Sequence, residues 1–181
     1  MKPRTSFLTL LTAAALLAAG CATEPTTETG RENLDSSISR VMKKLQDQDP
    51  SLTDFLGKSY AYVIFPTVGT GGVVVGGSYG HGEVFQSGKM IGYADISQVT
   101  AGAQIGGEAF TEIIAFENPD ALQRFKDGKL SLETTASAVL LKSGAAASST
   151  YNNGFVVFTQ PREGAMAAAV VGGQSFSFQP L

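Results

Sequence analysis

The chain has very little of the side-chain chemistry on which most enzymes and metal proteins depend. Its 181 residues include one cysteine, one histidine and no tryptophan. A single cysteine excludes an internal disulfide and any multi-cysteine zinc or iron–sulfur site, and a single histidine leaves little for a catalytic or metal-binding cluster. The charged fraction is 16%, whereas ordinary domains have about 25%. The formal net charge of −3 provides no basic field that could hold nucleic acid.

Glycine, in contrast, is abundant. Glycine makes up 21 of the 181 residues, about 12%, whereas its usual share is about 7%. The length suits one domain, and roughly 150 folded residues can bury a sufficient core without disulfides. We therefore expect a single glycine-rich domain that consists mainly of β-structure.

The first twenty residues have the pattern of a secretory signal peptide. Lys2 and Arg4 give a positive start, residues 6–19 are uncharged and rich in leucine and alanine, and Gly20 follows. A charged segment, a short apolar segment and small residues at the end are typical of such a peptide. The apolar segment is shorter than the about 20 residues that a membrane-spanning helix needs. Residues 1–20 are therefore predicted to be removed.

The only cysteine lies at the end of this segment. Leu17 to Cys21, with the sequence LAAGC, resembles the bacterial lipobox, in which the cysteine is acylated and becomes the mature N-terminus. Ordinary cleavage beside a chance cysteine is the alternative, but an unpaired thiol in an oxidising compartment is a liability. Ala22 follows in place of aspartate, which in enteric-type sorting implies the outer membrane. The expectation is a cell-envelope lipoprotein that Cys21 anchors in the outer membrane.

The mature chain is acidic. Removal of Lys2 and Arg4 leaves 11 basic and 16 acidic residues, a net charge of −5. Residues 21–30 are polar and turn-forming, which is typical of a flexible tether. Residues 31–181 are predicted to form the folded domain.

Helical spacing marks the start of that domain. Five apolar residues share one helical face: Leu34, Ile38, Val41, Met42 and Leu45. Asp49 and Pro50 are expected to end this helix. Ser51 is expected to cap a short second helix. A third helix is predicted from Asn118 to about Gly128.

Runs of β-branched and aromatic residues predict strands. They cover residues 60–65, 71–79, 83–86, 89–94, 99–106, 109–116, 155–159, 165–171 and 175–178. Pro66 is expected to end the first strand, and Ser87 with Gly88 to form a hairpin turn. Residues 132–141 fit a helix or a strand, and residues 144–150 form a loop of small residues.

Glycine pairs recur within these strands, at residues 76–77, 106–107 and 172–173. Glycine in a strand marks a bend, a bulge or a close approach of backbones. The pattern predicts an α+β fold with about three helices, including an N-terminal amphipathic one, and a strongly twisted, largely antiparallel sheet that is partly barrel-like.

Residues 76–80, GGSYG, match the GxSxG motif of hydrolases, with His81 beside it. That motif requires a strand, a sharp turn and then a helix. A strand pattern follows Ser78, so a glycine-rich strand is favoured and a serine hydrolase that uses Ser78 is a remote alternative.

Other patterns that could indicate a catalytic or ligand-binding site are weak. Residues 69–72 are glycine-rich, but no helix follows to bind a phosphate. His81 has Glu83 nearby but no second ligand cluster for a metal, so a polar loop histidine is the default interpretation. Glu108 and Glu112 could act as a glycosidase pair, but solvent-facing positions are favoured. We expect no catalysis, no metal and no cofactor.

The first helix carries bases opposite its apolar face. They are Arg40, Lys43 and Lys44, with Lys58 downstream. Such a helix can lie on a membrane, with its bases on headgroup phosphates. The alternative, which the pattern alone favours, is that the apolar face packs on the sheet and the bases face water. Three bases near an anionic surface supply roughly 3 kcal/mol at most.

Four ordered motifs resemble the SYLF domain family. They are LGKSYAYVIFP at residues 56–66, GGVVVGGSYGHG at 71–82, GAQIGGE at 102–108, and the pair IIAF at 113–116 and ALQRF at 121–125. The family often has glutamate or another polar residue where this chain has His81, and glutamine where it has Glu108. The resemblance extends from about Arg31 to the C-terminus.

The resemblance implies a lipid-binding module. Members bind phosphoinositides and other anionic phospholipids, partly through an N-terminal amphipathic helix and basic residues, and bacterial members are often secreted or lipidated. Only Arg40, Lys43, Lys44 and Lys58 match that role here. Actin binding is not expected, because no actin-contacting residue can be matched and the compartment differs. An envelope scaffold that binds a protein or glycan is the alternative.

Overall fold

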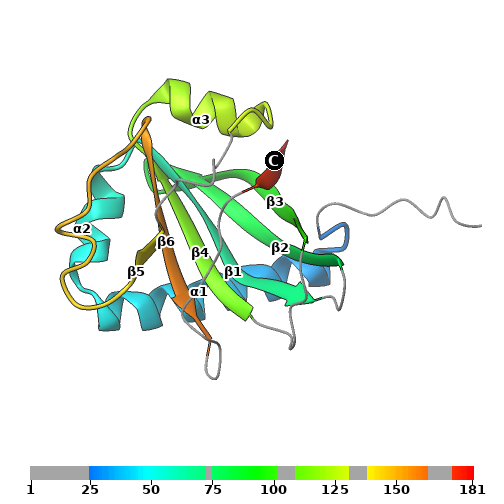
Figure 1. Ribbon diagram of the computed structural model, residues 1–181, viewed down its shortest axis with the longest axis horizontal. Helices are drawn as coiled ribbons and strands as arrows, with labels where there is room; N and C mark the ends of the chain where they lie inside the picture. The colour runs from blue at the N-terminus through cyan, green and yellow to red at the C-terminus, as the bar shows by residue number, and fades with distance from the viewer. Residues whose placement is uncertain (1–24, 72–74, 102–108, 131–137, 163–172) are drawn as a thin grey trace, which may run out of the picture.

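The computed structural model describes residues 25–71, 75–101, 109–130, 138–162 and 173–181 (Figure 1). The expected signal peptide and Cys21 lie outside these ranges, as do the predicted strand at 165–171 and the GAQIGGE motif. The residues within these ranges form three helices and one mostly antiparallel seven-stranded sheet, which confirms the predicted α+β class.

The described elements follow one another along the chain in a helix-first order. They are α1 (Glu28–Gln48), α2 (Ser51–Lys58), β1 (Ala61–Gly71), β2 (Val75–Gln86), β3 (Lys89–Ala101), β4 (Ala109–Phe116), α3 (Pro119–Lys126), β5 (Val139–Leu140), β6 (Phe155–Pro161) and β7 (Gln174–Pro180). The first turn of α1 overlaps the expected tether, because the Thr27 side chain accepts a hydrogen bond from the Gly30 amide at 3.1 Å and caps the helix there.

The strands are ordered β5-β6-β4-β1-β2-β3-β7. Every pair is antiparallel except β5 with β6. The two edge strands, β5 and β7, do not pair with each other in the described part of the chain. The sheet is therefore curled but not closed. The predicted partly barrel-like shape is found as curvature of the sheet, and not as a closed barrel.

The hairpin between β2 and β3 forms where it was predicted. Ser87 and Gly88 have φ values of 50° and 75°, which is the left-handed geometry that a two-residue hairpin turn requires. The two strands predicted at 71–79 and 83–86 are one continuous strand, β2, because its glycines bend the strand without ending it.

Pro66 does not end β1, contrary to the prediction. The pairing of β1 with β4 shifts register between Phe65 and Val68, and the pairing with β2 shifts between Ile64 and Gly69. A bulge of this kind accommodates a residue that has no amide hydrogen. The Thr111 hydroxyl donates a hydrogen bond to the Pro66 carbonyl at 3.0 Å, so the carbonyl is satisfied within the bulge.

Strand β2 approaches the backbone of β1 closely at two glycines. A Cβ atom on Gly80 would lie 2.6 Å from the Thr67 carbonyl oxygen, and one on Gly82 would lie 2.5 Å from that of Ile64. Both oxygens belong to β1, so β2 can pass this close only where it lacks side chains. Across the concave face, the Phe176 ring of the edge strand β7 lies 6.2 Å from the Phe65 ring of β1.

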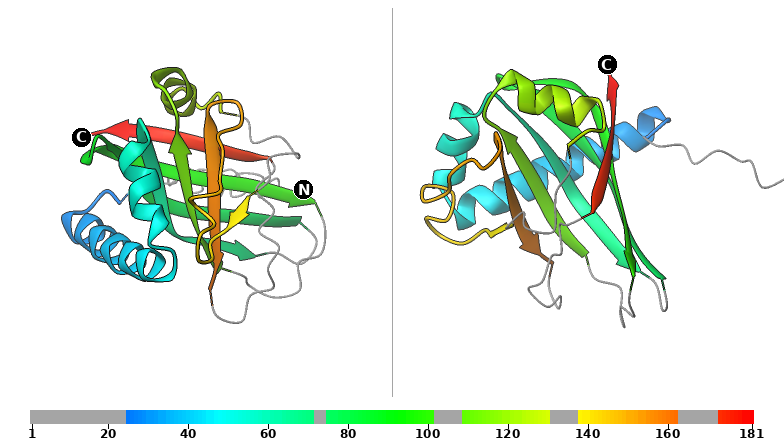
Figure 2. Two further views of the ribbon diagram at one scale, coloured as in Figure 1. Left: turned by 90° about the vertical axis from the view of Figure 1, so that its left-hand side faces the viewer. Right: turned by 45° about the horizontal axis from the view of Figure 1, so that its top comes forward.

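Helix α3 covers one end of this concave face (Figure 2). The Asn118 side chain accepts a hydrogen bond from the Ala121 amide at 3.0 Å and caps the start of α3, and Gly128 follows its end with a φ of 66°, as predicted. Phe125 of α3 is fully buried. Its ring lies 5.2 Å from the ring of Phe116 and 5.2 Å from that of Phe176.

Helices α1 and α2 cover the convex face (Figure 1). Ile64 and Phe158 of the sheet pack there against the helices, and Phe55 of α2 lies edge-on to Phe158 at 5.2 Å. The sheet thus has an apolar core on both faces, which leaves only limited parts of it for polar function.

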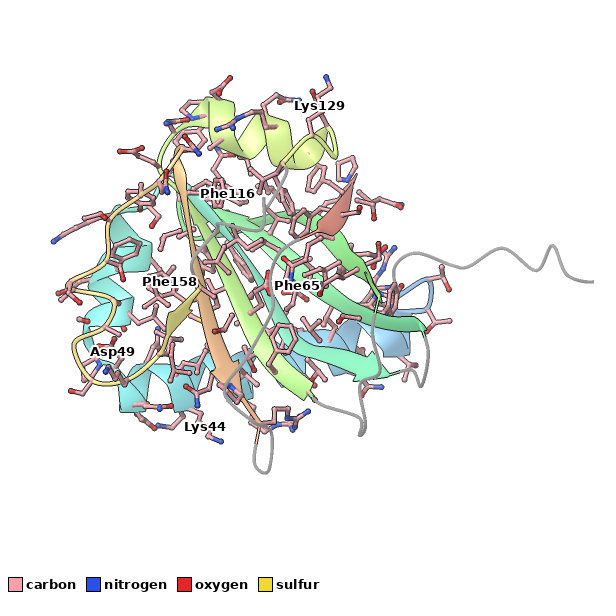
Figure 3. The ribbon with its side chains drawn as sticks, in the orientation of Figure 1. Lys44, Asp49, Phe65, Phe116, Lys129 and Phe158 are labelled. Atoms are coloured by element: carbon pink, nitrogen blue, oxygen red, sulfur yellow. The ribbon has the colours of Figure 1, made fainter. Side chains whose placement is uncertain are left out.

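Asp49, in the link between α1 and α2, is fully buried and organises this corner (Figure 3). One of its oxygens accepts hydrogen bonds from the Ser51 amide at 3.1 Å, the Ser51 hydroxyl at 2.6 Å and the Gly144 amide at 3.1 Å. The other accepts from the Ala146 amide at 2.8 Å. The N-cap of α2 is Pro50, which makes no side-chain capping hydrogen bond, and not Ser51 as predicted; Ser51 is the first residue of the helix, and Asp49 binds its amide.

Replacement of Asp49 by asparagine is expected to lower the free energy of unfolding by roughly 2 kcal/mol, because an amide NH2 would face the Ala146 amide. Burial by itself would raise the pKa of Asp49, but its hydrogen bonds outweigh burial and lower it. The stabilisation should therefore fade as the pH falls through that lowered pKa. Urea unfolding of D49N measures the loss. The exposed Asp47→Asn is the control and should change stability by less than about 0.5 kcal/mol.

Candidate functional site

The position of α1 decides which of its faces can meet a partner. Leu34, Ile38 and Leu45 are buried, and Val41 and Met42 pack against the same core. The apolar face of α1 thus lies on the sheet and on α2. This is the arrangement that the sequence pattern favoured over a helix lying on a membrane.

The predicted headgroup contacts of α1 face outward. Arg40, Lys43 and Lys44 are all exposed, and their spacing places them on one side of the helix. Lys43 donates to Asp47 one turn later, with a nitrogen–oxygen distance of 3.0 Å, so part of its charge is balanced. Arg40 and Lys44 are the more available pair.

Lys58 does not join this group. It is exposed, but it is the last residue of α2. A helix rises about 1.5 Å per residue, so Lys58 lies about 10 Å along α2 from the end of α1. The structure therefore brings together three of the four predicted residues, which we call the α1 basic group: Arg40, Lys43 and Lys44.

The other half of α1 is acidic and lies over a buried acid. Glu83 of β2 is almost fully buried on the convex face. Burial, and secondarily the charge of Asp35 on α1, raise the pKa of Glu83 to about 7. Nearby, the Arg31 guanidinium lies 4.8 Å from the centre of the Tyr93 ring. Positive charge on α1 therefore predominates in its C-terminal half and negative charge in this half.

Ser78 and His81 point to opposite faces of β2. Ser78 is buried on the concave face. His81 is half-exposed on the convex face, where its Nδ1 lies 2.6 Å from an Asp95 oxygen, and the Ser177 hydroxyl donates to the other Asp95 oxygen at 3.2 Å. His81 therefore cannot act as the base for Ser78. The alternation of side chains along a strand would have shown this from the sequence.

Two expectations about polar residues are corrected. His81 is a strand residue paired with Asp95, not a loop residue. Glu112 does not face solvent but is completely buried, and it accepts a hydrogen bond from the Gln174 amide at 2.9 Å. Glu108 lies outside the described ranges. The burial of Glu112 was not visible in the sequence, because it depends on how the sheet curls.

The described ranges contain no group of three or more histidine, cysteine, aspartate or glutamate side chains that could hold a metal ion. Among the helices of these ranges, none is both long enough and apolar enough to span a bilayer.

Comparison with models of known protein families gives no match, and no curated protein matches the chain significantly.

Proposed function

We propose that the chain is a bacterial lipoprotein whose folded domain, which resembles the SYLF family, binds anionic phospholipid at a membrane surface without catalysis. The α1 basic group is the observation that carries the proposal. It presents exposed positive charge on the side of α1 that faces away from the protein. The lipobox-like sequence ending at Cys21 would hold this surface near a leaflet.

The docked position of α1 defines the mode of contact that we propose. Its apolar residues are engaged with the sheet, so the helix contacts lipid through charge and does not insert. Each base near an anionic surface contributes about 1 kcal/mol and is screened by salt. Binding of the domain should accordingly be weak by itself and sensitive to ionic strength, with the acyl chain on Cys21 supplying the rest of the membrane affinity.

Vesicle flotation of the mature chain with Cys21→Ser tests this proposal, because no acyl chain then contributes. We expect binding to vesicles that contain phosphatidylserine, little binding to pure phosphatidylcholine, and loss of binding as salt increases. Combining Arg40→Glu with Lys44→Glu should weaken binding at least about tenfold, which corresponds to about 1.4 kcal/mol.

A charge-matched variant separates this site from net charge. Lys89→Glu with Lys129→Glu makes the same change in total charge at other exposed positions, and Figure 3 shows Lys129 beside α3, at the opposite end of the molecule from Lys44. This control should retain binding. Equal loss in both double variants would reject the α1 basic group, and no binding of the parent chain at low salt would reject the proposal as a whole. Retained membrane association of the full-length Cys21→Ser chain in cells would show that the anchor lies elsewhere.

A further inference from the structure

Glu112 and Gln174 meet across the open side of the curled sheet. Glu112 is on β4 and Gln174 is on β7, with three strands between them in the sheet order. The Gln174 amide nitrogen donates to one Glu112 oxygen at 2.9 Å. This side-chain contact spans the concave face, whose two ends are not joined by backbone pairing in the described part of the chain.

Each of these two side chains also carries a buried oxygen that has no partner. They are Oε1 of Glu112 and Oε1 of Gln174. Glu112 is fully buried and Gln174 is 4% exposed, so water cannot freely satisfy either oxygen. A buried polar atom without a partner is costly. Neither oxygen can donate to the other while Glu112 is ionised, because both are then acceptors only.

A single proton on Glu112 would give both of these oxygens a hydrogen-bond partner. If Oε1 of Glu112 is protonated, it becomes a donor for Oε1 of Gln174. The acid and the amide then exchange two hydrogen bonds, one in each direction. We propose that Glu112 is protonated in the folded protein and pairs in this way with Gln174, as a proton-dependent clasp that fastens β7 to β4 across the concave face.

The surroundings of Glu112 support the neutral form. The polar side chains of the concave face at this end are Ser78, Gln98, Thr159 and Gln174, all buried and uncharged. Burial raises the pKa of Glu112 to about 8, although the hydrogen bond from Gln174 lowers it, and no charged group of the described residues contributes to the shift. The other buried acid, Glu83, lies on the convex face, where the charge of Asp35 acts on it. The remaining charged or titratable groups nearby are on that same face, away from Glu112: Arg31, His81 and Asp95.

The clasp predicts the direction of pH dependence. An unfolded glutamate loses its proton near pH 4.5, whereas folded Glu112 keeps it to about pH 8. The folded state therefore binds more protons in this window, and the unfolding equilibrium constant rises with pH by up to tenfold per unit, levelling off above about pH 8. Below about pH 4.5 the stabilisation by the clasp is fully present.

Two measurements on the full chain test the clasp. Infrared difference spectra near pH 6 should show the C=O stretch of a protonated carboxylic acid that Glu112→Gln removes. In urea unfolding, E112Q should lose the increase in the unfolding constant between pH 7 and 8, because its amide pairs with Gln174 without a titrating proton. Glu83→Gln is the matched control. Because the pKa of Glu83 is about 7, this variant should lose the rise of the unfolding constant mainly below pH 7 and should retain the rise between pH 7 and 8.

Gln174→Leu provides a second variant if E112Q folds poorly. It keeps side-chain bulk but removes both the donor and the acceptor, so the carboxylic acid band should persist at a shifted frequency. An infrared spectrum that E112Q does not change, a wild-type pH slope in E112Q between pH 7 and 8, or an unshifted band in Q174L would each overturn the clasp.

Discussion

Replacement of Gly82 by alanine is expected to lower the free energy of unfolding by about 3 kcal/mol, the upper end of the usual range for overpacking a core. The new Cβ would lie 2.5 Å from the Ile64 carbonyl oxygen and 2.6 Å from the Phe65 ring. Neither neighbour can yield easily, because the oxygen belongs to the backbone of a central strand and Phe65 is fully buried. Relief of the overlap requires β2 to move away from β1 and the curl to open.

Thermal unfolding of Gly82→Ala measures this effect, and a loss of about 3 kcal/mol should lower Tm by roughly 6–12 °C. Gly69→Ala is the control in the neighbouring strand. Nothing lies within 4 Å of a Cβ at Gly69, so that variant should be neutral or slightly more stable, because alanine restricts the unfolded chain. Equal Tm values for the two variants would show that the close approach of β1 and β2 does not determine the curl.

Replacement of Phe125 by alanine is the second large effect, and we expect a loss of about 3–5 kcal/mol. Phe125 is the buried aromatic side chain by which α3 contacts the concave core, between Phe116 and Phe176. Its removal leaves a cavity between a helix and two strands that pair with other strands, so the cavity cannot readily collapse.

Urea unfolding combined with hydrogen exchange tests this prediction. Amides of α3 should lose protection in F125A more than those of α1, which packs on the other face. Leu140→Ala is the control, because Leu140 is 42% exposed and its truncation should cost less than about 1 kcal/mol. A loss in F125A no larger than that in L140A would contradict the view that α3 is held by its aromatic contacts.

Most element types could be predicted from the sequence, because they depend on local patterns. The apolar spacing from Leu34 to Leu45, the Asn118 cap and the Ser87–Gly88 turn each depend on neighbours within a few residues. Where the prediction failed, a distant partner decided the outcome. Pro66 lies within β1 because β1 forms a bulge there in its pairing with both β2 and β4.

The candidate site was predictable in part. The α1 basic group follows from helical spacing, and its exposure follows from the burial of the opposite face. Lys58 lies near this group in the sequence, but it stands at the far end of α2, and the length of that helix separates it from the group. Asp49 was interpreted only as a helix end, because its Gly144 and Ala146 partners lie almost a hundred residues away along the chain.

By itself, the sequence determined the order of helices and strands, the acidic balance and the lipobox-like pattern that ends at Cys21, since each depends on composition or on nearest neighbours. Only the tertiary structure decided which polar groups are buried. Glu112 and Gln174 are separated by 61 intervening residues, and they meet because the sheet curls. Burial is a property of that curvature, and so the chemistry of the buried acids is determined by the fold as a whole.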